Sequence, residues 1–269
     1  MLALVFPNID PVLIQLGPFA IRWYALAYIA GIVVGWRWCL HLLDKPPKVM
    51  TRQEFDDFLL WATLGIVLGG RLGYVLFYRP SYYLENPLEA LQVWHGGMSF
   101  HGGLLGVLLA IGLFARAKRV PYFALADVVA CGVPFGLFFG RIANFINGEL
   151  WGRVSDVPWA MVFPTGGPEP RHPSQLYEAG LEGIVLFLVV NGLCHLTRIR
   201  ERPGALSGVF LIGYGCARII SELFRQPDAF VGADGFLAFG LTMGQILSAP
   251  LIVVGLALVL WPRRRPATA

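Results

Sequence analysis

The chain has 269 residues, of which 56% are hydrophobic and only 14% are charged, and its mean hydropathy is +0.62. Soluble domains carry about 25% charged residues, so this composition argues against a soluble enzyme. The net charge of +4 comes from clusters in loops rather than from one extended basic face, so no nucleic-acid partner is expected.

Four cysteines stand inside apolar runs and show neither a CxxC spacing nor a Cys/His cluster. We therefore expect neither a disulfide framework nor a zinc site. Each is expected to be a small buried hydrophobic residue. The first 20 residues contain no Lys or Arg, so no cleavable signal peptide is expected. These cysteines are Cys39, Cys131, Cys194 and Cys216.

Seven apolar segments are long enough to cross a bilayer, which takes about 20 residues. Segment 146–174 is rich in Pro, Gly and Trp and is expected to form a small cap on the outer face. The sequence thus predicts an all-α integral membrane protein, a single domain over 1–269, with seven transmembrane helices and a small periplasmic cap. The expected spans cover about residues 16–39, 58–79, 97–115, 122–145, 175–196, 206–226 and 236–261.

Basic residues are divided unequally between the two sets of loops. Segments 40–57, 116–121 and 197–204 and the C-terminal tail each carry three, whereas the loops on the other side carry only Arg153 and Arg171. The positive-inside rule then places the C-terminus in the cytoplasm and the N-terminus outside. An odd number of spans is consistent with ends on opposite sides.

Glycines in the second and third predicted spans are expected to let two helices approach closely. They are Gly69, Gly70, Gly73, Gly102, Gly103 and Gly106.

Charged residues inside a span are costly, so each is a candidate functional residue. With a rise of about 1.5 Å per residue, Arg141 lies about 28 Å and Arg218 about 18 Å from the inner boundary, and His101 about 6 Å below the outer one. Polar groups from five helices therefore gather in the outer half of the bilayer. They are Tyr24, Arg71, His101, Arg141, Asn144, Arg218, Glu222 and Arg225.

The sixth span carries Tyr214, Arg218, Glu222 and Arg225 at spacings of 4, 4 and 3, so they share one face. Glu222 is expected to brace Arg218. The face would remain net positive, more so with Arg141, which suits a bidentate anion and above all a phosphate.

Structural alternatives exist for several of these residues. Arg22 and Arg225 fit equally well as side chains that snorkel to lipid head groups, and for Arg153 snorkelling is the favoured alternative. Arg71 fits as a structural partner of a carboxylate such as Glu222. His101 is either a helix–helix hydrogen-bonding residue or a general base, and the two glycines that follow it leave space beside the imidazole.

No GxSxG, HExxH, paired membrane aspartate or Walker loop is present, so an enzyme here would take its nucleophile from a substrate. A transporter is the main alternative, but it predicts a polar site near the midplane and often an inverted repeat, and neither is found. An intramembrane protease lacks its catalytic residues, and a membrane scaffold would not gather Arg, His and Glu at one depth.

The stretch "GRIANFINGELWGR" (140–153) resembles the signature of the prolipoprotein diacylglyceryl transferase family. His95 stands where the family more often has an acidic or amide residue. The resemblance covers nearly the whole chain, because further blocks agree: "IRWYALAY" (21–28), "GGRLGYVLFY" (69–78), "GGMSFHGGLLG" (96–106), "HPSQLYEA" (172–179) and "YGCARIISELFRQPD" (214–228).

This resemblance implies transfer of the diacylglyceryl group of phosphatidylglycerol to the lipobox cysteine of an exported prolipoprotein in the bacterial inner membrane, with release of glycerol phosphate. It implies critical roles for His101, Arg141 and Arg218. We expect Arg141 and Arg218 to clamp the phosphate and His101 to take the thiol proton. No metal, nucleotide or other cofactor is expected, because the lipid phosphoester is itself the activated group. Further functional positions that match are Tyr24, Asn144, Glu149, Gly152 and Glu222.

Overall fold

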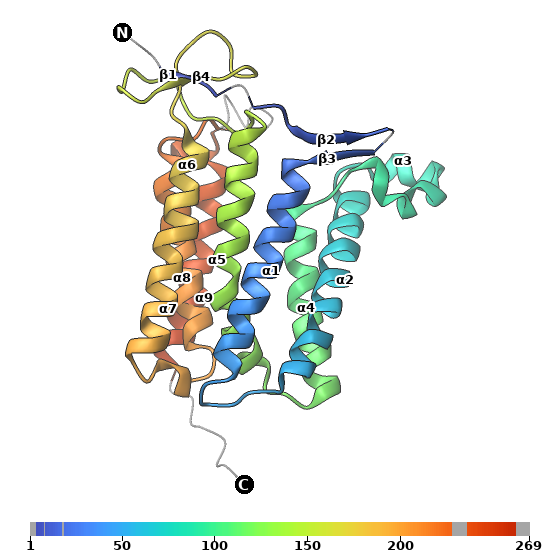
Figure 1. Ribbon diagram of the computed structural model, residues 1–269, viewed down its shortest axis with the longest axis vertical. Coiled ribbons are helices and arrows are strands. Elements are labelled where there is room, and N and C mark those ends of the chain that lie inside the picture. Colours follow the sequence, from blue (N-terminus) through green and yellow to red (C-terminus); the bar gives the residue numbers. More distant parts are fainter. Residues whose placement is uncertain (1–3, 8, 18, 228–235, 262–269) are drawn as a thin grey trace. The chain divides into compact units, whose positions relative to one another are not determined.

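The computed structural model describes residues 4–7, 9–17, 19–227 and 236–261, and most of them are helical (Figure 1). Seven of the described helical segments are long and apolar enough to cross a membrane, which confirms the predicted number. They are α1 (Trp23–Leu43), α2 (Arg52–Phe77), α4 (Phe100–Lys118), α5 (Tyr122–Ile146), the run α6–η3–α7 (Ser174–Leu196), α8 (Ala205–Glu222) and α9 (Met243–Leu260).

The chain divides into two compact units, one of residues 1–39 and 127–269 and the other of residues 40–126. Short elements join the long helices within them. These are α3 (Pro80–Glu85), η1 (Pro87–Leu91), η2 (Val93–His95), η4 (Ile199–Glu201) and η5 (Ala238–Gly240).

The first long helix begins at Trp23 rather than at residue 16, because the preceding residues form a β-hairpin. Strands β2 (Val12–Leu16) and β3 (Phe19–Arg22) pair antiparallel, with Leu16 opposite Phe19. Gly17 has a φ of +58° between them, a conformation that glycine adopts without strain. The all-helical prediction therefore omitted this hairpin.

Two helix beginnings differ from the predicted spans because of capping boxes. Helix α2 begins at Arg52 rather than at residue 58. The Thr51 side chain accepts a hydrogen bond from the backbone N–H of Glu54, and the Glu54 carboxylate accepts one from the backbone N–H of Thr51. Thr242 and Gln245 do the same for α9, which begins at Met243 rather than 236. Each box satisfies backbone donors that a helix N-terminus leaves unpaired.

In the larger unit, polar contacts join α5 to α7 and α8, and α7 to α1. Asn191 of α7 donates to the carbonyl of Cys131 in α5 and accepts from the indole of Trp38 in α1. Asp127, near the beginning of α5, accepts hydrogen bonds from the backbone N–H groups of Gly204 and Ser207. A carboxylate at a helix N-terminus is favourable, so Asp127 fixes the beginning of α8.

The third apolar run of this unit is not a uniform α-helix. Helix α6 (Ser174–Glu178) passes into the π-helical turn η3 (Ala179–Val185) and then into α7 (Leu186–Leu196). A π turn is rare and is found mostly at functional sites.

Residues 147–173 form a mostly non-helical segment that folds over the end of α5 (Figure 1). Strand β1 (Leu4–Val5) pairs in parallel with β4 (Met161–Val162). Phe6 lies against Phe145 and Phe163, with ring centroids 5.3 and 5.1 Å away. The predicted cap is thus a segment with its own aromatic core, and its position outside the membrane stays a prediction.

In the unit of residues 40–126, α2 and α4 pack along each other. Gly69 of α2 and Gly102 of α4 lie at their contact, where a Cβ on either one would meet the backbone of the other. The predicted role in close helix approach is confirmed for Gly69, Gly73, Gly102 and Gly106. It is not confirmed for Gly70 and Gly103, where an added Cβ would stay 3.5 Å or more from the backbone of the other helix.

One cysteine prediction is wrong. Cys39, Cys131 and Cys194 are buried, but Cys216 is exposed, because its position on α8 turns it away from the neighbouring helices. An apolar run in a membrane protein supplies lipid-facing positions as well as buried ones.

Candidate functional site

Arg141 is the central cation of the larger unit. Helix α5 carries it one turn before the helix ends, and its side chain is only 16% exposed. Its Nε and Nη2 donate to one oxygen of Glu182 at 3.2 and 3.1 Å, and its Nη1 lies 3.1 Å from Oε2 of Glu178. Two carboxylates of the α6–η3 segment therefore hold the guanidinium in a fixed plane.

Arg218 reaches the same two carboxylates from α8. Its Nη1 donates to Oε1 of Glu178 at 2.5 Å and lies 3.7 Å from Oε1 of Glu182. Its Nη2 donates to Glu222, four residues further along α8, so the predicted bracing of Arg218 by Glu222 is confirmed. A third guanidinium, that of Arg225, lies 3.4 Å from the same oxygen of Glu178.

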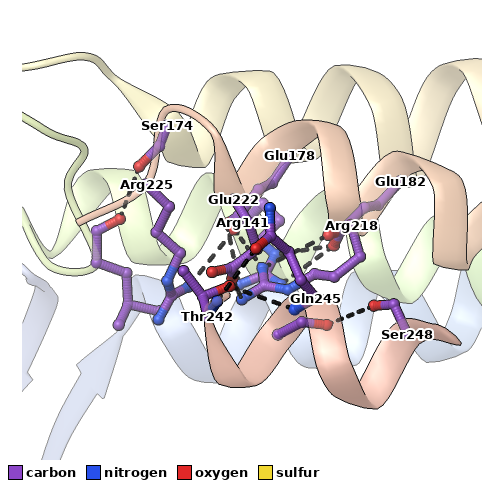
Figure 2. A network of polar contacts seen from close by, with 12 residues as sticks. Arg141, Ser174, Glu178, Glu182, Arg218, Glu222, Arg225, Thr242, Gln245 and Ser248 are labelled. Carbon is purple, nitrogen blue, oxygen red and sulfur yellow. Dashed lines mark hydrogen bonds and ion pairs between the residues drawn. The ribbon is translucent and has the colours of Figure 1, made fainter. Parts of the chain in front are cut away.

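We call these six residues, Arg141, Glu178, Glu182, Arg218, Glu222 and Arg225, the arginine–glutamate cluster (Figure 2). Its three guanidinium groups face three carboxylates, so its formal charge is zero. The expectation of a net positive face is therefore wrong. Glu178 and Glu182 were not among the predicted site residues, although two acidic residues inside one apolar span are themselves a signal of function.

Two arginines that fitted as snorkelling residues have protein partners instead. Arg225 is 8% exposed and pairs with Glu178. Arg153 donates to the backbone carbonyls of Glu222 and Arg225, just where α8 ends. These carbonyls have no partner within the helix, so Arg153 caps the end of α8. Helix α8 accordingly ends at Glu222 rather than at 226.

The polar residues after Arg141 join α5 to the next helix. Asn144 and Asn147 donate to the carboxylate of Glu149 at 2.9 and 3.3 Å. Gln175 of α6 donates to the backbone carbonyl of Glu149 at 2.5 Å. The hydroxyl of Tyr24 on α1 interacts with Asn144. Tyr24, Asn144 and Glu149, three of the positions singled out by the resemblance, are thus brought together by the structure.

Gly152 lies where three stretches of backbone meet. Its N–H donates to the carbonyl of His172 at 2.9 Å, and it forms a bridge with Arg225. A Cβ at this position would lie within 2.7 Å of the carbonyl oxygens of His172 and Phe224. Only glycine fits there, so its role is to let the 147–173 segment pack on the end of α8.

His172 itself is half-buried beside Tyr177, whose hydroxyl lies 3.0 Å from Nδ1 of the imidazole. Burial lowers the pKa of His172 below its ordinary value, because it penalises the charged imidazolium.

His101 and Arg71 belong to the unit of residues 40–126. His101 stands exposed in the first turn of α4, two residues after the N-cap Ser99, with its ring 5.7 Å from that of Phe100. Arg71 does not pair with Glu222, because its donors are taken by four backbone carbonyls of its own unit. These belong to Glu89, Ala90, Gly96 and Gly97.

The chain matches the model of the prolipoprotein diacylglyceryl transferase family over residues 11–261. The chain belongs to this family. Relatives named phosphatidylglycerol–prolipoprotein diacylglyceryl transferase include one from Paramagnetospirillum magneticum, 66% identical over 99% of this chain and 98% of its own length. Others from Gluconacetobacter diazotrophicus and Rhodospirillum rubrum are each 58% identical over 98% of this chain and 94% and 96% of their own lengths.

In this member of the diacylglyceryl transferase family, the signature stretch 140–153 contributes to two neighbouring sets of contacts. It supplies Arg141 to the arginine–glutamate cluster and Glu149 to the contacts at the end of α5. The cluster offers planar guanidinium forks in a largely buried setting, and such forks bind the oxygens of a phosphate two at a time. The arrangement suits recognition of a phosphate ester.

Proposed function

We propose that this chain transfers the diacylglyceryl group of phosphatidylglycerol to the lipobox cysteine thiol of an exported prolipoprotein. The products are a thioether-linked prolipoprotein and glycerol phosphate, and the step is the first of bacterial lipoprotein maturation. The observation that carries the proposal is the pair Arg141 and Arg218, held by shared carboxylates in a chain of this family.

The reaction forms a carbon–sulfur bond and breaks a carbon–oxygen bond. The cysteine thiolate attacks the glycerol carbon, and the electron pair of the broken bond stays on the phosphate oxygen. Negative charge therefore grows on the departing phosphate, and fixed guanidinium groups at that oxygen lower the barrier. Arg141 and Arg218 fill this role in the proposal, while Tyr24, Asn144, Glu149, Gly152 and Glu222 shape the surrounding site.

His101 is proposed as the base that removes the thiol proton. Histidine is the side chain that most often serves as a general base, and the His101 side chain is exposed at the beginning of α4. Replacement by Asn and by Gln tests the role. Near-full thioether formation in these variants, with normal binding of phosphatidylglycerol, would eliminate it.

The proposed location is the bacterial inner membrane, with the N-terminus periplasmic, the C-terminus cytoplasmic and the active site facing the outer leaflet. The unequal distribution of basic loops supports this orientation. An exported prolipoprotein would then reach the site from the side of the 147–173 segment.

The test is a transfer assay with purified enzyme, phosphatidylglycerol labelled in its acyl chains and a lipobox peptide. We expect label on the Cys peptide and none on a matched peptide with Ser in its place. Solute flux into liposomes without any labelled peptide would instead support a transporter.

A further inference from the structure

The neutral charge of the arginine–glutamate cluster creates a difficulty for binding an anion. A phosphodiester carries one negative charge, and every guanidinium of the cluster already has a carboxylate partner. An added anion would leave buried groups with one negative charge in excess, which is costly in a region of low dielectric. The cluster must therefore either lose an ion pair or gain a proton when the lipid binds.

Glu178 is the carboxylate of the cluster that an incoming anion would displace least readily. Its Oε1 is bound to Arg218 and Arg225, and its Oε2 lies 3.1 Å from Arg141. Its removal would leave all three guanidiniums with one partner fewer. Glu222 is also confined: it follows Arg218 by one turn on the same helix, and it packs against the backbone of Gly244.

Glu182 is held by fewer contacts. Within the part of the chain that the structure describes, its Oε2 accepts two hydrogen bonds, both from Arg141, while its Oε1 has no hydrogen-bonding partner and lies 3.7 Å from Arg218. It belongs to the π turn η3, an element whose irregular hydrogen bonding is often used at functional sites. Figure 2 shows the Glu182 side chain at the edge of the cluster, reached from one side by the arginines.

The face of Arg141 that Glu182 occupies is the one a phosphate would use. Nε and Nη2 donate side by side, and such a pair matches two oxygens of a carboxylate or of a phosphate equally well. Glu182 thus acts as an internal substitute for the ligand.

We propose that the phosphodiester of the lipid replaces Glu182 on the Nε and Nη2 of Arg141, and that the displaced carboxylate takes up one proton from solvent. This inference rests on the proposed function, because it names the lipid phosphate as the ligand. The charge balance is complete: one anion enters, one proton follows it, and the cluster stays neutral. Proton uptake avoids a buried, unpaired carboxylate.

The groups that face Glu182 come from each helix packed around it. Arg141 approaches from α5, Arg218 and Tyr214 from α8, and Glu178 from α6. Once the phosphate holds Arg141, the adjacent Glu178 carboxylate repels a second negative charge at Glu182. That repulsion favours the protonated form of Glu182 in the complex.

The test is a titration of the purified full-length enzyme in neutral detergent with phosphatidylglycerol, at several pH values over which the lipid keeps its single charge. For the wild type we expect Kd to rise with pH, by at most about tenfold per pH unit for one linked proton. Glu182→Gln should bind without this pH dependence, and about tenfold tighter than the wild type at the upper end of the range, because the amide has no charge to lose.

Glu222→Gln is the matched control, since it changes a carboxylate of the same cluster that stays in place. Its Kd should keep the slope of the wild type. Loss of the slope in Glu222→Gln but not in Glu182→Gln would overturn the assignment. An equal slope in every variant, or a wild-type Kd that does not change with pH, would overturn the exchange itself.

A second measurement does not depend on the folding of any variant. Adding phosphatidylglycerol to the wild-type enzyme in weak buffer with a pH indicator should consume about one proton per lipid bound. If lipid binding consumes no proton, the proposed exchange at Glu182 is overturned, even if labelled peptide forms normally. If neither lipid binding nor labelled peptide is seen, the proposed function fails as well.

Discussion

Arg218 and Glu178 stand 40 positions apart in the sequence, yet Nη1 of the arginine lies 2.5 Å from Oε1 of the glutamate. This ion pair joins α8 to α6, and Glu178 is fully buried beneath it. The same carboxylate contacts Arg141 and Arg225. One acidic side chain therefore sets the spacing of the two arginines that we propose to hold the phosphate.

Replacement of Glu178 by Ala should lower both stability and activity. It leaves three guanidiniums without a shared partner, and the loss of one member of a buried ion pair costs about 3–5 kcal/mol. We expect a lower melting temperature in detergent and transfer activity reduced by about two orders of magnitude. Glu178→Gln keeps the shape and one acceptor, so its melting temperature should fall less. Equal melting temperatures for Ala and wild type would show that Glu178 does not hold the cluster together.

Gly152→Ala should disrupt the packing of the 147–173 segment on the end of α8. The new methyl group would collide with the backbone of Phe224 and His172, and overpacking of this kind costs about 1–3 kcal/mol. We expect a lower melting temperature together with lower activity. Gly192→Ala in α7 is the control, because nothing lies within 4 Å of its added methyl group. A wild-type melting temperature for Gly152→Ala would refute the packing role.

The sequence predicted the number of long helices and singled out four of the six residues of the arginine–glutamate cluster, but not how they pair. Helical rise predicts a depth for Arg141 and Arg218, whereas their pairing depends on rotation about each helix axis, which a single sequence does not specify. Glu178 and Glu182 could have been found, since they are the acidic residues of one apolar span. The hairpin before Trp23 was less accessible, because its apolar residues read equally well as a helix.

Acidification should destabilise the protein through His172. Burial lowers the pKa of this side chain in the folded state. At pH values between the lowered pKa and the ordinary pKa of histidine, the unfolded chain therefore binds more protons than the folded protein. Stability is therefore unaffected at high pH and falls as the pH decreases through the ordinary histidine range. Melting temperatures measured against pH should show this loss, and His172→Gln should reduce it. An unchanged pH profile in that variant would exclude His172 as the cause.

Asp127→Ala should affect stability more than catalysis. The carboxylate accepts three hydrogen bonds of 2.7 Å from Gly204 and Ser207 at the beginning of α8, and Arg218 lies more than three turns further along. Hydrogen bonds to a charged group contribute about 1.5–3 kcal/mol, so the melting temperature should fall. The KM for phosphatidylglycerol should stay near that of the wild type when folded enzyme is assayed. A large rise in KM at unchanged stability would point to a direct role in the site.

Arg71→Lys should loosen the segment between α3 and α4 even though the charge is kept. The guanidinium donates through Nε, Nη1 and Nη2 to four carbonyls of residues 89–97, and a lysine ammonium is a single point that cannot span them. Limited proteolysis of the intact enzyme in detergent should cut residues 86–97 faster in the variant. Arg79→Lys is the control, because Arg79 is exposed and stacks only on Tyr82 among the contacts described for it. If both variants are cut at the wild-type rate, the carbonyl contacts of Arg71 do not hold the segment. Faster cutting in Arg79→Lys alone would show that the stacked pair of Arg79 and Tyr82 holds it instead.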